Sequence, residues 1–154
     1  MLTDLSIPFL VEAGFVTEEE AKEKYDFLKG MVSVLKEKLQ YVKEITDHAS
    51  IFFGDTVELE TEECGEFLKL EHIPTLVDAL IEKLSNMEVL DEASAKAMLK
   101  EIQKEHGIKG KNLFMGSRIS LTGQMHGPDL NKIMEVIGKE TCLNRLNYVK
   151  NNIL

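Results

Sequence analysis

Residues 129–150, DLNKIMEVIGKETCLNRLNYVK, contain the pattern that decides the fold class. Apolar residues recur three or four positions apart on both sides of Gly138, the spacing at which side chains share one face of an α-helix. These residues are Leu130, Ile133, Met134 and Ile137 before the glycine and Leu143, Leu146 and Val149 after it. We therefore predict two helices separated by the glycine, one from about Pro128 to Gly138 and one over 140–152.

The residues upstream of this stretch show the same helical spacing, with recognisable helix ends. Pro74 is typical of a first helical turn, Asp91 of an N-cap, and Gly107 of the residue that follows a helix. The predicted helices span about 74–86, 91–106 and 112–121. The apolar face predicted for the second of them is Ala93, Ala97, Met98 and Ile102. No segment alternates apolar and polar residues for long enough to predict a β-strand.

In the N-terminal half, a helix is predicted to begin near residue 18, just after Thr17. Glu20 follows three residues later, so the two side chains can form a capping box at the helix start. An apolar stripe at helical spacing then runs from Ala21 to Val42, and we expect Gly30 to divide it into two packed helices. The same stripe also fits a coiled-coil seam, although the glycine favours a small bundle.

An acidic segment, residues 57–67, follows this stripe and is interpreted as a solvent-exposed connector. A chain of 154 residues is long enough for two small helical bundles, each with its own apolar core. We therefore predict an all-α fold with two helical-bundle subdomains, residues 1–60 and residues 61–154.

Charge is distributed unevenly along the chain. The formal net charge is −9, but residues 1–92 carry 8 Lys and Arg against 22 Asp and Glu, whereas residues 93–154 carry 10 against 5. The first part therefore has a formal charge of −14 and the second a formal charge of +5. Only the second part suits a polyanionic partner such as a nucleic acid.

Motifs for catalysis, metal binding and membrane insertion are not evident in the sequence. The four histidines are far apart, and there is no HExxH, GxSxG, GxGxxG or Walker pattern. Cys64 and Cys142 have no cysteine or histidine at ligand spacing and are interpreted as reduced, half-buried thiols. No apolar run approaches the ~20 residues of a membrane span, and the N-terminus lacks signal-peptide features. We expect a cytoplasmic protein with no catalytic residue, metal or cofactor of its own.

Arg118 begins the stretch RISLTGQMHGPDL, residues 118–130, in which glycines punctuate the chain. Its guanidinium can pair with a base edge or stack on a base, and Lys109 and Lys111 just upstream can hold phosphates. Apolar contacts of the surrounding helix are assigned to Leu113, Phe114 and Leu121. The alternative is a structural arginine that bonds carbonyl groups at a helix C-terminus. The residues alone leave both interpretations open.

Two further features allow a nucleic-acid interpretation beside a structural one. Phe52 and Phe53 could stack on bases, but adjacent phenylalanines at a helix end are more often core residues. The two helices on either side of Gly138 have the length and break of a helix-turn-helix, which would place Arg145 against DNA. Two packed helices joined by a glycine more often form a simple hairpin within a bundle.

Residues 110–146, GKNLFMGSRISLTGQMHGPDLNKIMEVIGKETCLNRL, closely resemble the C-terminal end of bacterial-type glutamyl-tRNA synthetases. The matching positions are the Gly110-Lys111 loop, Arg118, Leu121-Thr122-Gly123, Gly127-Pro128, Gly138-Lys139-Glu140 and Arg145-Leu146. Two N-terminal segments, 7–15 and 35–45, resemble the same family more diffusely. The resemblance therefore covers nearly the whole chain and is most specific over residues 109–147.

The resemblance implies an all-α anticodon-binding region of two subdomains that recognises the anticodon loop of glutamate tRNA. It places Arg118 at the position of an arginine that contacts anticodon bases, and Gly127 and Leu130 at neighbouring positions near the anticodon. Lys38 stands where the family carries another anticodon-reading arginine. Its ammonium cannot make the planar bidentate contact of a guanidinium and supplies only charge.

The resemblance also implies a longer parent enzyme. The catalytic half of the family carries HIGH-like and KMSKS-like motifs for ATP, and neither occurs in these 154 residues. We expect this chain to be a C-terminal fragment that has no active site and adjoins that catalytic domain. The parent enzyme is expected to make glutamyl-tRNA from ATP, glutamate and tRNA, with magnesium. The alternative function is a helical protein-interaction adaptor that binds no nucleic acid. We expect neither DNA nor a membrane as a partner.

Overall fold

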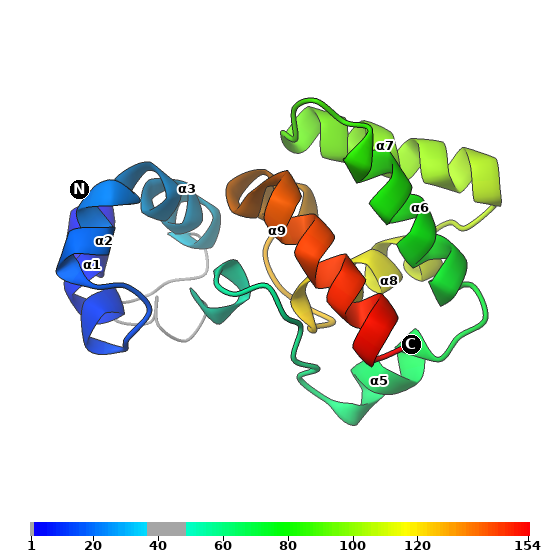
Figure 1. Cartoon of the computed structure of the whole chain (residues 1–154), viewed down its shortest axis with the longest axis horizontal. Helices are drawn as coiled ribbons and strands as arrows, with labels where there is room; N and C mark the ends of the chain where they lie inside the picture. Colours follow the sequence, from blue (N-terminus) through cyan, green and yellow to red (C-terminus); the bar gives the residue numbers. More distant parts are fainter. Residues whose placement is uncertain (1, 37–48) are drawn as a thin grey trace. The chain divides into compact units, whose positions relative to one another are not determined.

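The structure, a computed structural model, describes residues 2–36 and 49–154. Every regular element in these two ranges is a helix, which confirms the predicted all-α fold (Figure 1). None of these helices is long and apolar enough to cross a membrane. The chain divides into two compact units, Met1–Gly54 and Asp55–Leu154, whereas the boundary expected from the sequence lies after residue 60.

The first unit is a small bundle of short helices. Its elements are α1 (Leu2–Glu12), α2 (Glu18–Glu23), α3 (Tyr25–Leu35) and a 3-10 helix, η3 (Ala49–Phe52). Helix α1 packs against both α2 and α3, and the largest fully buried side chains are Leu10, Leu28, Met31 and Leu35. The predicted capping box is confirmed, because the Glu20 amide donates to Thr17 Oγ1 at 3.1 Å and the Thr17 amide donates to Glu20 Oε1 at 3.2 Å.

Gly30 does not divide the apolar stripe of this unit, contrary to the prediction. Helix α3 runs through Gly30, and the break lies at Lys24, whose backbone angles (φ −105°, ψ 25°) leave the helical region between α2 and α3. Burial of Leu28 and Met31 on either side of the glycine offsets the roughly 1 kcal/mol that glycine costs inside a helix. The end of the stripe, residues 39–42, lies outside the described residues.

Three phenylalanine rings meet in the first unit. Phe53 stacks on Phe15 with ring centroids 5.2 Å apart, and it meets Phe27 edge to face at 5.6 Å. Phe52 is only 2% exposed. These contacts support the core interpretation of both phenylalanines over base stacking.

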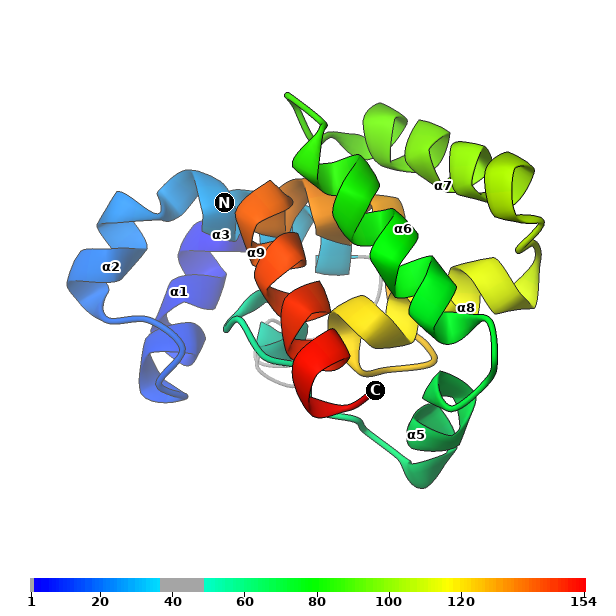
Figure 2. The same cartoon turned by 45° about the vertical axis from the view of Figure 1, so that its right-hand side comes forward.

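The second unit is built around its longest helix. Its elements are α5 (Glu62–Leu68), α6 (Ile73–Ser85), α7 (Glu92–His106), α8 (Lys111–Thr122) and α9 (Leu130–Asn152). Helix α9 lies beside α6 and also packs against α7 and α8 (Figures 1 and 2). Gly138 has non-helical backbone angles (φ 85°, ψ 163°) and breaks α9, which confirms the division predicted there.

The apolar stripe predicted for residues 130–149 faces the core of this unit. Its buried members are Leu130, Ile133, Met134, Ile137, Leu146 and Val149, and Leu143 is half-buried. Burial of each such side chain stabilises the fold by about 1.5–3 kcal/mol. The stripe therefore holds α6, α7 and α8 around α9.

Helix α7 has the predicted ends but a different buried face. The Ser94 amide donates to the Asp91 carboxylate at 2.7 Å, and Gly107 (φ 68°) ends the helix. The buried face is Ala95, Met98, Leu99 and Ile102. The predicted Ala93 and Ala97 are exposed. Because alanine is compatible with either face of a helix, the three alanines did not fix the orientation of α7.

Residues 57–67 are only in part the solvent-exposed connector that was predicted, because their five glutamates are exposed but the segment also contains the start of a helix. Helix α5 begins after Thr61, whose hydroxyl accepts a hydrogen bond from the Cys64 amide at 3.4 Å. Cys64 and Leu68 are buried, and α5 packs against α8. Two glutamates occupy the first turn, where a carboxylate interacts favourably with the positive end of the helix dipole. The acidic run is therefore a helix start.

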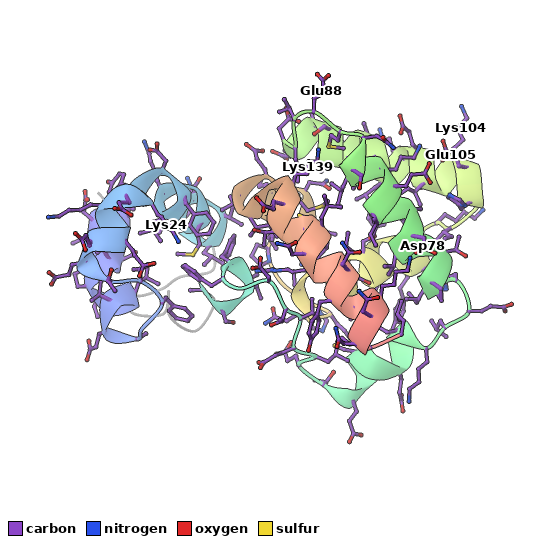
Figure 3. All side chains as sticks on the ribbon, viewed as in Figure 1. Lys24, Asp78, Glu88, Lys104, Glu105 and Lys139 are labelled. Carbon is purple, nitrogen blue, oxygen red and sulfur yellow. The ribbon has the colours of Figure 1, made fainter. Side chains whose placement is uncertain are left out.

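Two lysines join α9 to neighbouring elements at the surface. Lys150 Nζ lies 2.8 Å from a carboxylate oxygen of Asp78 on α6, and Lys139 Nζ donates to the Met87 carbonyl at 2.8 Å. Figure 3 labels Asp78 on α6 and Lys139 on α9. The side chains of Lys150 and Asp78 are 51% and 58% exposed, so their ion pair contributes at most about 1 kcal/mol.

Both cysteines are fully buried rather than half-buried. Cys64 and Cys142 are free thiols, each with 0% exposure. Burial raises the pKa of Cys142 to about 12, although the positive charge of Arg145 opposes the shift. Because the thiolate is the reactive form of cysteine, the buried Cys142 thiol is unreactive near neutral pH.

We expect the native protein to react with the thiol reagent DTNB at least about 100-fold more slowly than the protein unfolded in guanidinium chloride, because the buried thiols are inaccessible and Cys142 stays protonated. A Cys64→Ser variant isolates Cys142. Rapid modification of Cys142 in that folded variant would contradict its burial.

A tight turn at Gly123 (φ 74°) follows α8. The Glu60 amide donates to the Gly123 carbonyl at 2.9 Å, which joins the turn to the segment before α5. A Cβ atom at position 123 would collide with the carbonyl oxygen of Glu58, so both the positive φ and the close approach require glycine. These contacts fix the C-terminal end of α8, the helix that carries Arg118.

We expect Gly123→Ala to lower the free energy of unfolding by about 3 kcal/mol, from left-handed strain and from the collision with Glu58. Gly107→Ala is the matched control, because Gly107 also follows a helix at positive φ (68°) but has open space around its Cβ position. The control should cost about 1 kcal/mol. Urea denaturation followed by circular dichroism measures both, and equal costs would argue against the close packing at Gly123.

Candidate functional site

A pocket of about 360 Å³ opens beside α8 in the second unit. Its lining comes from three successive helices: from α7, from the middle of α8 and from the start of α9. The lining residues are Leu99, Phe114, Met115, Arg118, Asp129, Leu130 and Asn131. The pocket therefore combines an apolar floor with one guanidinium, one carboxylate and one amide.

Arg118 is half-buried at this pocket. Its Nη1 atom is buried and has no hydrogen-bond partner among the described residues. Burial lowers the pKa of Arg118 and the carboxylate of Asp129 opposes that shift, and the guanidinium remains charged at any physiological pH. A buried, charged donor without a partner is costly unless a ligand satisfies it.

Gly127 provides the surface on which the Arg118 guanidinium lies. A Cβ atom at this position would lie only 3.1 Å from Arg118 Nη1, closer than a side chain normally approaches. Gly127 also has φ 153°, a backbone conformation that residues with a side chain rarely adopt. The absence of a side chain at Gly127 therefore leaves room for the arginine.

Asp129 and Asn131 place oxygen acceptors at the same pocket. Asp129 is the N-cap of α9, and its Oδ1 accepts from the amides of Asn131 at 2.9 Å and Lys132 at 3.4 Å. The Oδ1 atom of Asn131 is buried and has no hydrogen-bond partner among the described residues. Two residues that line the pocket, Arg118 and Asn131, therefore each have one buried polar atom without a partner among the described residues.

The last turn of α8 holds Arg118 in place. The Thr122 hydroxyl donates to the Arg118 carbonyl at 2.8 Å, and the Gly123 amide donates to the Ile119 carbonyl at 2.8 Å. Arg145, from α9, donates through Nη1 to the Leu121 carbonyl at 3.0 Å. The carbonyl groups that a helix leaves open at its C-terminus are therefore partly satisfied by tertiary contacts.

Arg145 has the structural role that the sequence analysis considered for Arg118. It is 2% exposed, and burial lowers its pKa while Cys142 and Asp55 oppose the shift. Its guanidinium bonds a carbonyl at a helix C-terminus, as the structural interpretation requires. A side chain buried to this extent cannot reach a DNA groove, so the helix-turn-helix interpretation is wrong for Arg145.

The other residues predicted to contact nucleic acid are distributed differently. Leu130 is 6% exposed and contributes to the pocket wall. Lys109 and Lys111 are exposed immediately before and at the start of α8. Lys111 precedes Arg118 by seven residues, two helical turns, and so lies on the same face of α8. Lys38 lies outside the described residues.

Within residues 2–36 and 49–154, no three or more His, Cys, Asp or Glu side chains are grouped so as to hold a metal ion. One histidine has a clear structural contact instead: a ring nitrogen of His72 lies 3.0 Å from the Asn112 carbonyl in the first turn of α8. His72 therefore helps to hold the start of the helix that carries Arg118.

The family model described as "Anticodon binding domain" matches residues 1–150. The chain belongs to this family. The anticodon binding domain is 76% identical over 153 residues to the glutamate–tRNA ligase of Clostridioides difficile (strain 630), covering 99% of this chain and 31% of the relative. It is 50% identical over 153 residues to the glutamate–tRNA ligase of Alkaliphilus metalliredigens (strain QYMF), with the same coverage of both chains.

A solved structure has the same fold. The crystal structure of a glutamate tRNA ligase from Elizabethkingia meningosepticum, in complex with its amino acid, matches the anticodon binding domain with a TM-score of 0.77 and 26% identity. The match covers 100% of this chain and 30% of the solved one. The chain thus spans about a third of the length of the relatives that it matches.

Five of the seven pocket residues of the anticodon binding domain were not predicted as part of a site: Leu99, Phe114, Met115, Asp129 and Asn131. Phe114 was assigned to apolar contacts, but it is 52% exposed. Its position one turn before Arg118 was the available signal, because residues four apart share a helix face. Asp129 and Asn131 follow Pro128 at a helix start, where an N-cap was recognisable, but their meeting with α8 depends on the tertiary fold.

We expect Arg145→Met to lower the free energy of unfolding by about 2–4 kcal/mol, because methionine fills the space but leaves the buried Leu121 carbonyl without its donor. Asn147→Ala is a suitable control, since Asn147 is an exposed residue of the same helix and should change stability by less than about 0.5 kcal/mol. Urea denaturation measures both, and a neutral Arg145→Met variant would show that the hydrogen bond is dispensable.

Proposed function

We propose that this anticodon binding domain recognises the anticodon loop of glutamate tRNA and that Arg118 contacts its bases. The observation that carries the proposal is the half-buried Arg118 side chain, which lines an open pocket and whose Nη1 atom has no partner among the described residues. The relatives with 76% and 50% identity are glutamate–tRNA ligases, which supports tRNA as the polyanionic partner.

The chemistry of the pocket suits unpaired bases. Bases of a single-stranded loop can be turned outward and hydrogen-bonded at their edges, which a closed duplex does not allow. A guanidinium offers planar donors to such an edge, and it stacks on a base face as well. The bonds at the end of α8 hold the backbone of Arg118, and burial of its Nη1 atom beside Gly127 restricts the guanidinium, which lowers the side-chain entropy still to be lost on binding.

The surrounding charges favour RNA in the second unit. Residues 93–154 carry a formal charge of +5 in a chain of net charge −9. Lys109 and Lys111 are exposed beside the start of α8, where they are free to contact phosphates on either side of a bound loop. We propose this contact for both residues, and we retain Lys38 as a further electrostatic contact. Gly127 and Leu130 shape the pocket for a base.

We infer that the domain belongs to a longer glutamate–tRNA ligase, in which another region carries the active site. Such an enzyme joins glutamate to its tRNA with ATP, a magnesium-dependent reaction for which we assign no residue of this chain. We propose that the first unit adjoins that catalytic region and that the protein acts in the cytoplasm. Recognition of the loop by the second unit would then determine which tRNA reaches the active site.

We expect Arg118→Ala to weaken binding of glutamate tRNA by about 1–3 kcal/mol, roughly 5- to 150-fold, and to reduce discrimination against anticodon mutants. Fluorescence anisotropy of labelled tRNA measures both effects. Lys104→Ala is a suitable control, because Lys104 is an exposed cation of α7 that does not line the pocket. An equal loss for every anticodon sequence would reduce Arg118 to a phosphate contact or a structural residue.

Ionic strength distinguishes this function from that of a protein-interaction adaptor. Each phosphate contact releases counterions, so we expect the affinity for tRNA to fall several-fold or more between low and physiological salt. Absence of tRNA binding by the folded chain at low salt would favour the adaptor.

A further inference from the structure

Three lysines form a row on the exposed side of α7. Lys96, Lys100 and Lys104 follow one another at intervals of four residues, the spacing that places side chains on one helix face. All three residues are exposed, and Figure 3 shows the Lys104 side chain directed away from the ribbon. The row spans about 12 Å along the helix axis. These three residues are the lysine row of α7.

The lysine row forms no ion pair within the parts of the chain that the structure describes. Two of the three carboxylates of α7, those of Glu101 and Glu105, lie 3.3 Å and 2.9 Å from Lys83 Nζ of α6. They therefore interact with α6 instead of the lysine row. Glu92 is the third carboxylate and lies one turn before Lys96. The row consequently keeps a net positive charge.

This concentration of charge is unfavourable for the helix itself. Like charges four residues apart repel each other, and the lysine row contains two such pairs. Other lysines have carboxylate partners, as in the pairs Lys24–Glu20 at 3.8 Å and Lys150–Asp78 at 2.8 Å. In a chain with 27 acidic and 18 basic residues, an exposed helix face with three unpaired cations points to an anionic partner outside the chain.

The lysine row begins beside the pocket that Arg118 lines. Leu99 of α7 is part of that pocket, and Lys96 lies one turn before Leu99 on the same side of the helix. Ala93 and Ala97 are also exposed, and their short side chains let a strand approach the helix closely. An RNA strand that leaves the pocket on the α7 side therefore meets the lysine row next.

We propose that the lysine row of α7 binds the phosphate backbone of the tRNA strand that continues from the bases at the Arg118 pocket. The inference rests on the proposed function and adds a second surface to it, which contributes affinity without base preference. Lysine offers a point charge on a flexible stem, which suits a phosphate, whereas a guanidinium suits a base edge. An acidic protein could satisfy the same charges, but the position of the row beside Arg118 favours RNA.

The lysine row is tested with the full chain and an RNA stem-loop that has the anticodon arm sequence of glutamate tRNA. The variant combines Lys96→Ala, Lys100→Ala and Lys104→Ala, and alanine favours the helix, so α7 stays folded. We expect binding at low salt to weaken about 10- to 100-fold. The slope of log affinity against log salt concentration should become shallower by about 2, because fewer counterions are released. The ratio of affinities for correct and mutated anticodons should stay unchanged.

Two matched variants serve as controls. Replacement of all three residues of the row by arginine keeps the charge and should retain the salt slope. Replacement of Lys22, Lys24 and Lys29 by alanine removes the same charge from exposed positions of the first unit and should leave the slope nearly unchanged. Lys104→Ala alone removes one charge of the row and weakens binding of all anticodon sequences alike, so it remains a control for base discrimination by Arg118.

The results separate failure of this inference from failure of the proposed function. If the wild-type chain binds the stem-loop and depends on Arg118, but the triple-alanine variant of the row keeps the wild-type salt slope, the row does not contact RNA. The inference is also overturned if the first-unit variant loses as much slope, or if the variant of the row loses anticodon discrimination. If the folded wild-type chain does not bind the stem-loop at low salt, the proposed function itself is overturned, together with the inference that rests on it.

Discussion

The hydrogen bond from the buried Arg145 guanidinium to the Leu121 carbonyl is the constraint on which the second unit depends. It joins the second half of α9 to the last turn of α8. The two bonded residues are 24 positions apart in the sequence. The bond gives a partner to the Leu121 carbonyl at the end of a helix, and it does so with a charge that is costly to bury. The position of Arg118, one turn earlier on α8, follows from this attachment.

The two arginines show how burial assigns different tasks to the same side chain. Arg145 is 2% exposed and its Nη1 atom has a carbonyl partner, so it is part of the framework. Arg118 is half-buried, lines a pocket and has an Nη1 atom without a partner among the described residues, so its side chain is not committed to the framework in the way that Arg145 is. The sequence around the two arginines does not distinguish these roles, because both residues lie within helices and have polar neighbours.

Local signals predicted much of the fold, and tertiary contacts explain the rest. The ends of α7 and the break at Gly138 were predicted correctly, because caps and glycine breaks depend on neighbouring residues only. Gly30 was misread because packing keeps α3 continuous through it. At the site, resemblance to a family indicated Arg118, whereas the exposure of Phe114 and the burial of Asn131 Oδ1 depend on three helices that meet only in the fold.

The contact between residues 58–60 and the Gly123 turn has a practical consequence for anyone trimming the chain. Glu60 donates its amide to Gly123, and Val57, only 5% exposed, belongs to the core of the same unit. A shortened version that started at α5 would lack residues 55–61 and would expose the apolar surface that Val57 covers. The smallest piece able to preserve the geometry around α8 therefore has to begin no later than Asp55, well before its first regular helix.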